Sequence, residues 1–273
     1  MKRNKYLRFD RRPRLFTILS IGLISLVLIA PMNFVLISPG DPTPLYPKTL
    51  TISGPKTYPS TGNLYLLTVL ITNPETEVPG AEVLGCWAWG DCAVAPRAAY
   101  YQKESNDKEE RASGLKDMSE SQSSAVNAAR IELQKRFPSI DISGLKQSSV
   151  KVHLENTGGP SGGLIFTLGL IELMTPDDLL AGRKVAGTGT IEADGTVGPI
   201  GGVTEKIFGA KSAKADLLFI PRSNCDEAPA TVEGITVVAV STVDEAISYL
   251  LTHPKGEKHL NSGRIRGCAN VGA

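Results

Sequence analysis

A run of 23 residues without a charged side chain, from Leu15 to Ile37, is the feature that most restricts what this chain can fold into. At about 1.5 Å of rise per residue, a helix of this length spans the roughly 30 Å hydrocarbon core of a bilayer. The run predicts either one transmembrane helix or the apolar part of a cleaved signal peptide. Its length exceeds the roughly 7 to 15 residues usual in a signal peptide, and no small-residue cleavage site follows it, which favours the membrane anchor.

The segment before this run, residues 1–14, carries seven Lys or Arg side chains and one acid. A basic flank stays in the cytoplasm, so the sequence predicts a single-pass cell-membrane protein with a cytoplasmic N-terminus and an extracytoplasmic domain. The whole chain has a net charge of +1, so the remainder has a net charge of −5. Nucleic-acid binding needs a clustered basic face. We therefore expect residues 15–37 to bind the membrane, and we expect no nucleic-acid partner.

The rest of the chain is predicted to contain one folded domain. Hydrophobic residues make up 41% of the sequence, which supports a packed core and excludes wholesale disorder. Residues 38–62 contain six prolines and predict an extended stalk. Residues 63–252 mix strand and helix patterns without an internal repeat, which predicts a single α+β domain. Residues 253–273 predict a polar, frayed tail.

Within the domain, short β-rich runs predict strands, and apolar residues at a spacing of three to four predict helices. Predicted strands cover residues 64–72, 150–154, 185–191, 217–220 and 235–240. Predicted helices cover residues 118–137, 164–174 and 203–215, and a last helix starts at a capping box between Thr242 and Glu245. The charged residues 103–117 predict a solvated loop.

Two cysteines, Cys86 and Cys92, flank a short aromatic segment, C-W-A-W-G-D-C. Outside the cytoplasm this spacing predicts a small disulfide-closed hairpin. Its tryptophans, Trp87 and Trp89, are expected to anchor the hairpin in the core.

The other two cysteines, Cys225 and Cys268, either pair with each other or remain separate buried thiols. A structural zinc site needs more Cys or His ligands close together than the first pair provides. The three histidines stand apart from that pair in the sequence, at His153, His253 and His259. We therefore expect no metal site and no cofactor.

Two glycine-rich turns each precede an apolar helix pattern, T-G-G-P-S-G-G at residues 157–163 and G-P-I-G-G-V-T-E-K at residues 198–206. A small-residue turn at a helix N-terminus exposes backbone N–H groups that can hold a phosphate or a developing oxyanion. A phosphate-binding P-loop requires a lysine directly after its last glycine, but Leu164 follows Gly163. The turns therefore predict an oxyanion site rather than an ATP site.

An oxyanion site implies a nucleophile, and Ser161 lies in the middle of the first turn. A serine needs a nearby base, and a lysine that is neutral through burial can serve. Lys206 follows the second glycine turn and has apolar neighbours on its predicted helix. Taken singly, Ser161 fits an ordinary turn residue and Lys206 a solvated helix lysine.

The three motifs together, G-G-P-S-G-G, V-A-G-T-G-T-I and P-I-G-G-V-T-E-K, resemble the proteolytic domain of Lon-type serine peptidases over residues 60–251. The resemblance implies Ser161 as nucleophile, Lys206 as general base, and Thr188 as a hydrogen-bond partner of the catalytic lysine. The turn that it implies around the oxyanion comprises Gly159, Pro160 and Gly162.

The layout is most similar to membrane-anchored, ATP-independent Lon-like proteases. It departs from them because only about 23 residues separate Phe137 from Ser161, too few for the PDZ domain that those proteins commonly insert. It departs from cytosolic Lon enzymes at Gly158, where they carry an acidic residue. The resemblance implies an endopeptidase that cleaves flexible or unfolded polypeptides and that forms a homo-oligomer.

Two other functions fit parts of the sequence. One is a catalytically silent membrane scaffold with the same fold. The other is an esterase, because residues 159–163 also satisfy the G-x-S-x-G pattern of α/β-hydrolases. That esterase would need His253 or His259 as its base. A serine-directed probe separates the three possibilities.

Overall fold

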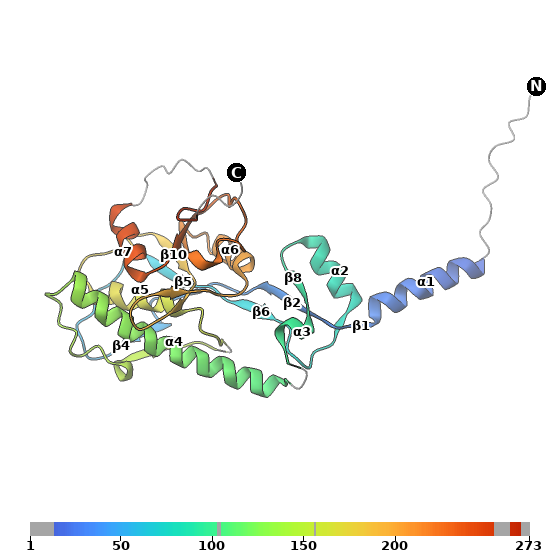
Figure 1. Ribbon diagram of the computed structural model, residues 1–273, viewed down its shortest axis with the longest axis horizontal. Helices are drawn as coiled ribbons and strands as arrows, with labels where there is room; N and C mark the ends of the chain where they lie inside the picture. The colour runs from blue at the N-terminus through green and yellow to red at the C-terminus, as the bar shows by residue number, and fades with distance from the viewer. Residues whose placement is uncertain (1–13, 103–104, 156, 254–262, 269–273) are drawn as a thin grey trace, which may run out of the picture.

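The computed structural model describes residues 14–102, 105–155, 157–253 and 263–268. A body of mixed helices and strands occupies one end of the molecule, and the first helix, α1 (Arg14–Ile29), projects from it (Figure 1). Most of the basic segment, residues 1–13, lies outside the described residues. The mixed α+β domain predicted from the sequence is confirmed.

The body is built on a five-stranded sheet with the strand order β14-β13-β10-β5-β3. Four neighbouring strands run parallel, and the edge strand β3 is antiparallel to β5. Alternate residues of β13 face opposite sides of the sheet, so that Phe219 and Leu218 belong to two separate cores. The strands are β3 (Thr43–Pro44), β5 (Asn63–Leu66), β10 (Lys184–Gly187), β13 (Leu217–Pro221) and β14 (Thr236–Val240).

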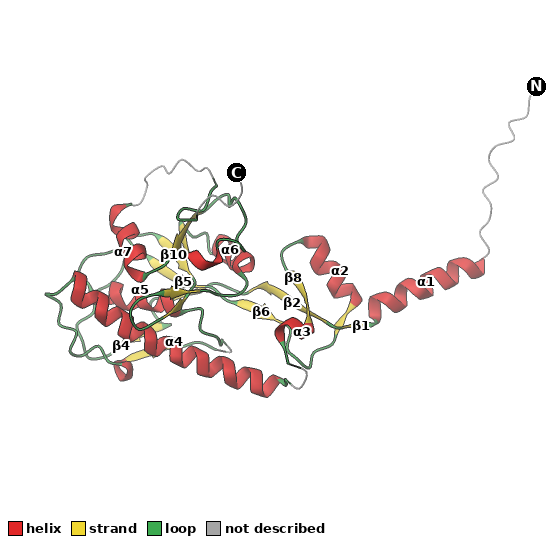
Figure 2. Ribbon diagram, in the orientation of Figure 1, coloured by secondary structure: helices red, strands yellow, loops and turns green. Residues whose placement is uncertain are grey.

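Helices cover both faces of this sheet (Figure 2). Residues of α4 (Asp107–Arg136), α5 (Gly163–Met174) and α7 (Val243–Thr252) form the larger core on one face. Helix α6 (Val203–Ser212) contributes to the smaller core on the other face. Helix α5, which follows the turn with Ser161, and helix α6, which contains Lys206, therefore lie on opposite faces of the sheet.

Smaller sheets surround the central one. A three-stranded antiparallel sheet has the order β6-β2-β8, and three two-stranded ladders pair β1 with β7, β4 with β9, and β11 with β12. These strands are β1 (Pro31–Met32), β2 (Phe34–Pro39), β4 (Leu50–Ile52), β6 (Val69–Ile71), β7 (Val78–Pro79), β8 (Ala93–Pro96), β9 (Val150–Val152), β11 (Thr190–Ile191) and β12 (Val197–Gly198). The remaining elements are helices α2 (Gly80–Trp89) and α3 (Arg97–Tyr100) and the 3₁₀ turns η1 (Gln147–Ser149) and η2 (Arg222–Asn224).

The apolar run at residues 15–37 forms a shorter helix than predicted. Helix α1 ends at Ile29, and Pro31 follows, which lacks the N–H that a continuing helix would use. The end of the run is strand β2, in which Val35 and Ile37 are buried. None of the helices in the described residues is long and apolar enough to cross a membrane. The prediction of one helix over the whole run is wrong because an uncharged apolar run is typical of a buried strand as well as of a helix.

The predicted stalk at residues 38–62 is wrong for much of its length, because this segment is part of the domain. It contains β3 and β4, and Leu45 and Leu50 are fully buried in the larger core. Pro44 is accommodated because β3 is an edge strand, where a missing N–H costs no ladder bond.

The charged segment at residues 103–117 is helical from Asp107 onward, so the predicted loop is wrong there. The side chain of Asn106 caps the helix by accepting a 3.0 Å hydrogen bond from the amide of Glu109. Three acidic residues in the first turn complement the helix dipole. Composition indicated solvent exposure correctly but did not exclude a helix.

Two predicted strands are broken. Residues 64–72 divide into β5 and β6, which belong to different sheets, and residues 185–191 divide into β10 and β11 at Thr188 and Gly189. The helix predicted at residues 118–137 ends as expected but begins 11 residues earlier, at Asp107. The remaining predicted helices and strands are confirmed to within a few residues, including α7, whose cap Thr242 accepts from the amide of Glu245.

The predicted tail at residues 253–273 is partly ordered. Its residues 263–268 pack on the domain, and Ile265 is buried in the smaller core. Residues 254–262 and 269–273 lie outside the described part of the chain.

Both cysteine pairs are disulfides. Cys86 joins Cys92, as predicted, and Cys225 joins Cys268, which answers the question that the sequence left open. The prediction that the two tryptophans between the first pair anchor it in the core is wrong. Trp87 is 79% exposed and Trp89 is 81% exposed. They point outward because they lie on α2, whose buried residues are Gly80 and Cys86.

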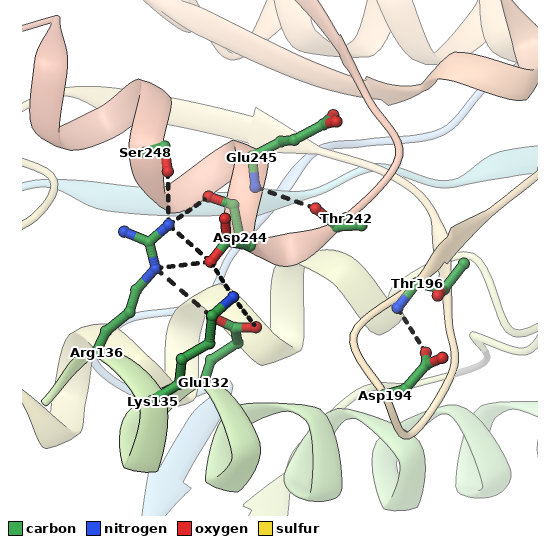
Figure 3. A network of polar contacts seen from close by, with 9 residues as sticks. All are labelled: Glu132, Lys135, Arg136, Asp194, Thr196, Thr242, Asp244, Glu245 and Ser248. Carbon is green, nitrogen blue, oxygen red and sulfur yellow. Dashed lines mark hydrogen bonds and ion pairs between the residues drawn. The ribbon is translucent and has the colours of Figure 1, made fainter. Parts of the chain in front are cut away.

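A polar network joins the end of α4 to the start of α7 (Figure 3). Arg136 donates to the carboxylate of Asp244 at 3.1 Å, to its backbone carbonyl at 3.0 Å, and to the hydroxyl of Ser248 at 2.6 Å. Lys135 lies 2.6 Å from the same carboxylate, and Glu132 lies 3.6 Å from Arg136. This network fixes one end of the long helix α4 to the body of the domain.

Candidate active site

The turn that carries Ser161 is held by the bend between β10 and β11. The backbone carbonyl of Ser161 accepts a 2.8 Å hydrogen bond from the amide of Gly189. It also accepts a 3.2 Å hydrogen bond from the hydroxyl of Thr188, a fully buried side chain. The amide of Leu164 in turn donates to Gly189 at 3.1 Å. The predicted bond between Thr188 and Lys206 is not among the hydrogen bonds of the described residues.

Helix α4 holds the same turn from another side. The amide of Gly159 donates to the carbonyl of Gly114 at 2.8 Å, and the hydroxyl of Ser121 donates to the carbonyl of Pro160 at 2.9 Å. Sequence reasoning missed Gly114 and Ser121. The available signal was that Ser121 lies within the apolar spacing of a predicted amphipathic helix, where a lone small polar residue needs a buried partner.

These contacts limit which groups of the predicted oxyanion turn can bind an oxyanion. The amide of Gly159 is already bonded to Gly114, and Pro160 has no N–H. The amides of Ser161 and Gly162 donate to no acceptor in the described part of the chain. Of the three predicted turn residues, only Gly162 can therefore donate to an oxyanion. The amide of Ser161 is a second available donor.

Lys206 lies in the first turns of α6 with its side chain 2% exposed. The helix begins at Gly202, which has the left-handed backbone (φ 69°) that favours glycine, and the amide of Lys206 donates to its carbonyl at 3.0 Å. Burial lowers the pKa of Lys206 to about 8, against the smaller opposing effect of the Glu205 carboxylate. Lys211, on the same helix, is exposed.

Ser161 and Lys206 line one cavity of about 540 Å³. No hydrogen bond joins the two side chains in the described residues. Glycines of both predicted turns contribute to the wall, and most of the rest is apolar. The apolar lining residues are Ile37, Leu66, Leu67, Val69, Leu70, Ile71, Met118 and Pro160. The structure thus brings together the serine and the lysine that the sequence motifs indicated.

Of the two histidines that the esterase interpretation requires, His253 is described, and it does not lie at this cavity. His253 follows the end of α7, where its ring stacks on Tyr249 with the ring centres 4.0 Å apart. It is not among the residues that line the cavity, and His259 lies outside the described residues. The described residues also contain no group of three or more His, Cys, Asp or Glu side chains that could hold a metal ion.

Residues 103–253 match the family described as the Lon protease (S16) C-terminal proteolytic domain. The chain belongs to this family. The match confirms the resemblance seen in the three motifs, and it contains α4, both glycine turns and α7, whereas α1 to α3 lie before it.

Relatives of this Lon-type domain come from distant organisms. The chain is 34% identical over 122 residues to Lon protease 2 of Bacillus subtilis, covering 42% of this chain and 21% of that protein. It is 34% identical over 163 residues to Lon protease 2 of Herpetosiphon aurantiacus, covering 54% and 19%. It is 31% identical over 153 residues to a mitochondrial Lon protease homolog of Debaryomyces hansenii, covering 53% and 14%. The chain therefore matches about a fifth or less of the length of these relatives.

Proposed function

We propose that the chain is an ATP-independent serine endopeptidase in which Ser161 is the nucleophile and Lys206 the general base. The observation that carries this proposal is a buried amine with a pKa of about 8 in the same cavity as the serine of the glycine turn. Near that pH a large fraction of Lys206 is neutral and can accept a proton, which an exposed lysine could not do at the same pH.

In the proposed reaction the hydroxyl oxygen of Ser161 attacks the carbonyl carbon of a peptide bond while its proton passes to Lys206. The oxyanion is stabilised by the amides of Ser161 and Gly162, an effect worth about 2.7 to 4 kcal/mol per donor. Lys206 returns the proton to the leaving amine, and an acyl ester of Ser161 remains. A water molecule then attacks the ester carbon and gives a proton to Lys206. Lys206 passes this proton to the Ser161 oxygen as the ester C–O bond breaks, so the peptide acid leaves and the serine hydroxyl is regenerated.

The cavity favours extended or unfolded polypeptide as substrate. Strand β6 lines the cavity and lies at the edge of its sheet, with Leu70 and Ile71 exposed. Apolar walls beside the nucleophile suit apolar side chains that a folded protein would keep buried. ATP independence is proposed because neither glycine turn has a P-loop lysine, and both turns serve the site described above.

Membrane anchoring is proposed from α1, which is apolar and exposed around its circumference and follows a basic segment. Because the 16 residues of α1 are fewer than an ordinary span needs, the proposed arrangement requires the bilayer to thin around it. The N-terminus is then cytoplasmic and the domain extracytoplasmic in the cell membrane. Two disulfides fit an oxidising compartment. Homo-oligomer formation is proposed from the family resemblance alone.

A fluorophosphonate probe, combined with cleavage of a quenched fluorescent unfolded polypeptide, tests the function. We expect labelling and cleavage by the wild type, and loss of both in Ser161→Ala and Lys206→Met. His253→Ala should keep both, because its ring lies outside the cavity. A wild type that neither reacts nor cleaves would indicate a scaffold, and loss of labelling in His253→Ala would indicate an esterase.

A further inference from the structure

Helix α4 contacts the serine turn directly beside the nucleophile. The hydroxyl of Ser121, which is 5% exposed, donates to the carbonyl of Pro160 at 2.9 Å. That carbonyl and the amide of Ser161 belong to one planar peptide unit, in which they point in opposite directions. The same carbonyl accepts a longer bond, of 3.4 Å, from the amide of Gly163, so the bond from Ser121 is the shorter of the two. Fixing the carbonyl of Pro160 also fixes the direction of the Ser161 N–H.

We propose that Ser121 is a positioning residue that orients the Ser161 amide as an oxyanion donor. This inference rests on the proposed Ser161 and Lys206 mechanism, because it assigns that amide a role in the same reaction. An accepted hydrogen bond at the carbonyl also polarises the peptide unit and strengthens its N–H as a donor. The effect belongs to the transition state, in which the oxyanion forms, rather than to substrate binding.

A close backbone contact supports the same arrangement. A Cβ placed on Gly158 would lie 2.9 Å from the carbonyl carbon of Gly114 and 3.0 Å from its Cα. A Cβ placed on Gly114 would instead lie 3.5 Å from the Cα of Gly158, which is an ordinary contact. Residue 158 must therefore be glycine for α4 to reach the turn, whereas residue 114 tolerates alanine.

Steady-state kinetics of Ser121→Ala tests this proposal. We expect kcat to fall about tenfold, with KM within about twofold of the wild type and an unchanged pH midpoint for kcat/KM, since Lys206 is untouched. Ser119→Ala, at an exposed position of the same helix, is the matched control and should behave as the wild type. Wild-type kcat in Ser121→Ala, or a loss that merely follows the unfolded fraction, would overturn the proposal.

The glycine pair gives a second test that does not depend on the stability of Ser121→Ala. Gly158→Ala should lower kcat, whereas Gly114→Ala should keep kcat and raise Tm slightly because alanine favours a helix. Equal kcat values in the two variants would contradict the proposed contact. If instead Ser161→Ala retained activity, the mechanism itself would fail, which is a distinguishable outcome.

A second inference comes from α2, which places both tryptophans of the chain on its exposed side. Helix α2 starts beside the end of α1, where the amide of Gly80 donates to the carbonyl of Ala30 at 3.1 Å and β7 pairs with β1. The Cys86–Cys92 disulfide closes its other end. Figure 1 shows α2 adjoining the point at which α1 leaves the body.

The length of α1 indicates what covers this surface. Its 16 residues extend about 24 Å, less than the roughly 30 Å hydrocarbon core. A span that is too short draws flanking residues into the interface, where tryptophan is favoured. The segment before α1, residues 1–13, is basic. The exposed apolar side chains that flank α1 are therefore those of α2, namely Leu84, Trp87 and Trp89.

We infer that α2 lies in the headgroup region of the outer leaflet, on zwitterionic lipid. This inference rests on the proposed membrane anchoring. Residues 78–96 contain the acids Glu82 and Asp91 and no Lys or Arg, so the contact does not depend on anionic lipid.

Fluorescence quenching in phosphatidylcholine vesicles tests this inference on the full chain. The chain has two tryptophans and seven tyrosines, so tryptophan is excited selectively, and Trp87→Phe and Trp89→Phe each leave one reporter. We expect both to be quenched by lipid brominated near the headgroup more strongly than by lipid brominated near the chain end.

Flotation of the chain with the vesicles reports on α1 separately. Flotation without lipid quenching would overturn the contact of α2 and leave the anchoring by α1 standing. The same holds if the tryptophans are protected from an aqueous quencher but not quenched by lipid, because a protein contact then covers them. Absence of flotation would overturn both the anchoring and this inference.

Discussion

The hydroxyl of Thr188 donates to the backbone carbonyl of Ser161 at 3.2 Å, which ties the serine turn to the bend between two strands. The family resemblance implied a different partner for this threonine, the amine of Lys206. The two arrangements have different consequences for the pH dependence of the reaction.

Thr188→Val keeps the shape of the side chain and removes its hydroxyl. We expect kcat/KM to fall by roughly tenfold, because the turn loses one buried hydrogen bond while the bond from Gly189 remains. The pH midpoint should stay unchanged. Thr175→Val, also buried but at the end of α5, is the control and should alter stability only. A shifted midpoint in Thr188→Val would indicate that the threonine acts on Lys206.

The pH profile of the wild type follows from the lowered pKa of Lys206. Because the neutral amine is the active form, kcat/KM should rise about tenfold per pH unit below pH 8 and level off above it. Lys206→Arg should be inactive at every pH between about 6 and 10, because a guanidinium stays protonated. A flat profile for the wild type, or turnover by Lys206→Arg, would contradict the proposed base.

Lys206 should also lower the stability of the domain. Its pKa is about 8 in the folded protein, against an ordinary value of 10.5, so the unfolded chain binds more protons between these values. The free energy of unfolding should therefore rise with pH from 8 to 10.5. We expect Lys206→Met to be more stable than the wild type by about 1 to 3 kcal/mol at pH 7 in urea unfolding. Lys211→Met, at an exposed position, is the control. An equal gain in the free energy of unfolding in this variant would show that burial of Lys206 is not the cause.

Glu172 should give the free energy of unfolding the opposite pH dependence. Burial, with a smaller effect from the Asp178 carboxylate, raises its pKa to about 7, and one of its oxygens has no hydrogen-bond partner among the described residues. The protonated form is favoured in the folded protein, so this stabilisation is complete below the ordinary value of 4.5 and is lost as pH rises through 7.

We expect Glu172→Gln to be more stable than the wild type by about 1 to 3 kcal/mol at pH 8, with the difference shrinking toward pH 5. Urea unfolding at several pH values measures this difference. The exposed Glu192→Gln is the control and should follow the wild type. A difference that stayed constant with pH would show that titration of Glu172 is not its cause.

That Ser161 and Lys206 line one cavity could be predicted because each lies in a local motif of a family that the sequence resembles. Helix α7 could be predicted for a similar reason, since its cap depends on residues three positions apart. Ser121 could not be found in this way. Its place on an apolar helix face indicates only that it needs a buried partner, and that partner is a backbone carbonyl 39 positions away, which the sequence does not identify.

The apolar run at residues 64–72 shows another limit of sequence reasoning. Nothing in its hydrophobicity marks the point where the chain leaves one sheet for another, because both strands have buried neighbours. The break matters for the site, since β6 then forms a wall of the cavity. The division depends on long-range pairing with β10 and β2, which a local pattern does not contain.

The continuity of α4 bears on where a working fragment of this protein can begin. The apolar spacing alone predicts that this helix starts at Met118. A truncation there would keep all three motifs and remove Gly114. Such a minimal unit would retain the three motifs, yet the turn that carries Ser161 would have lost one of its two hydrogen bonds to α4.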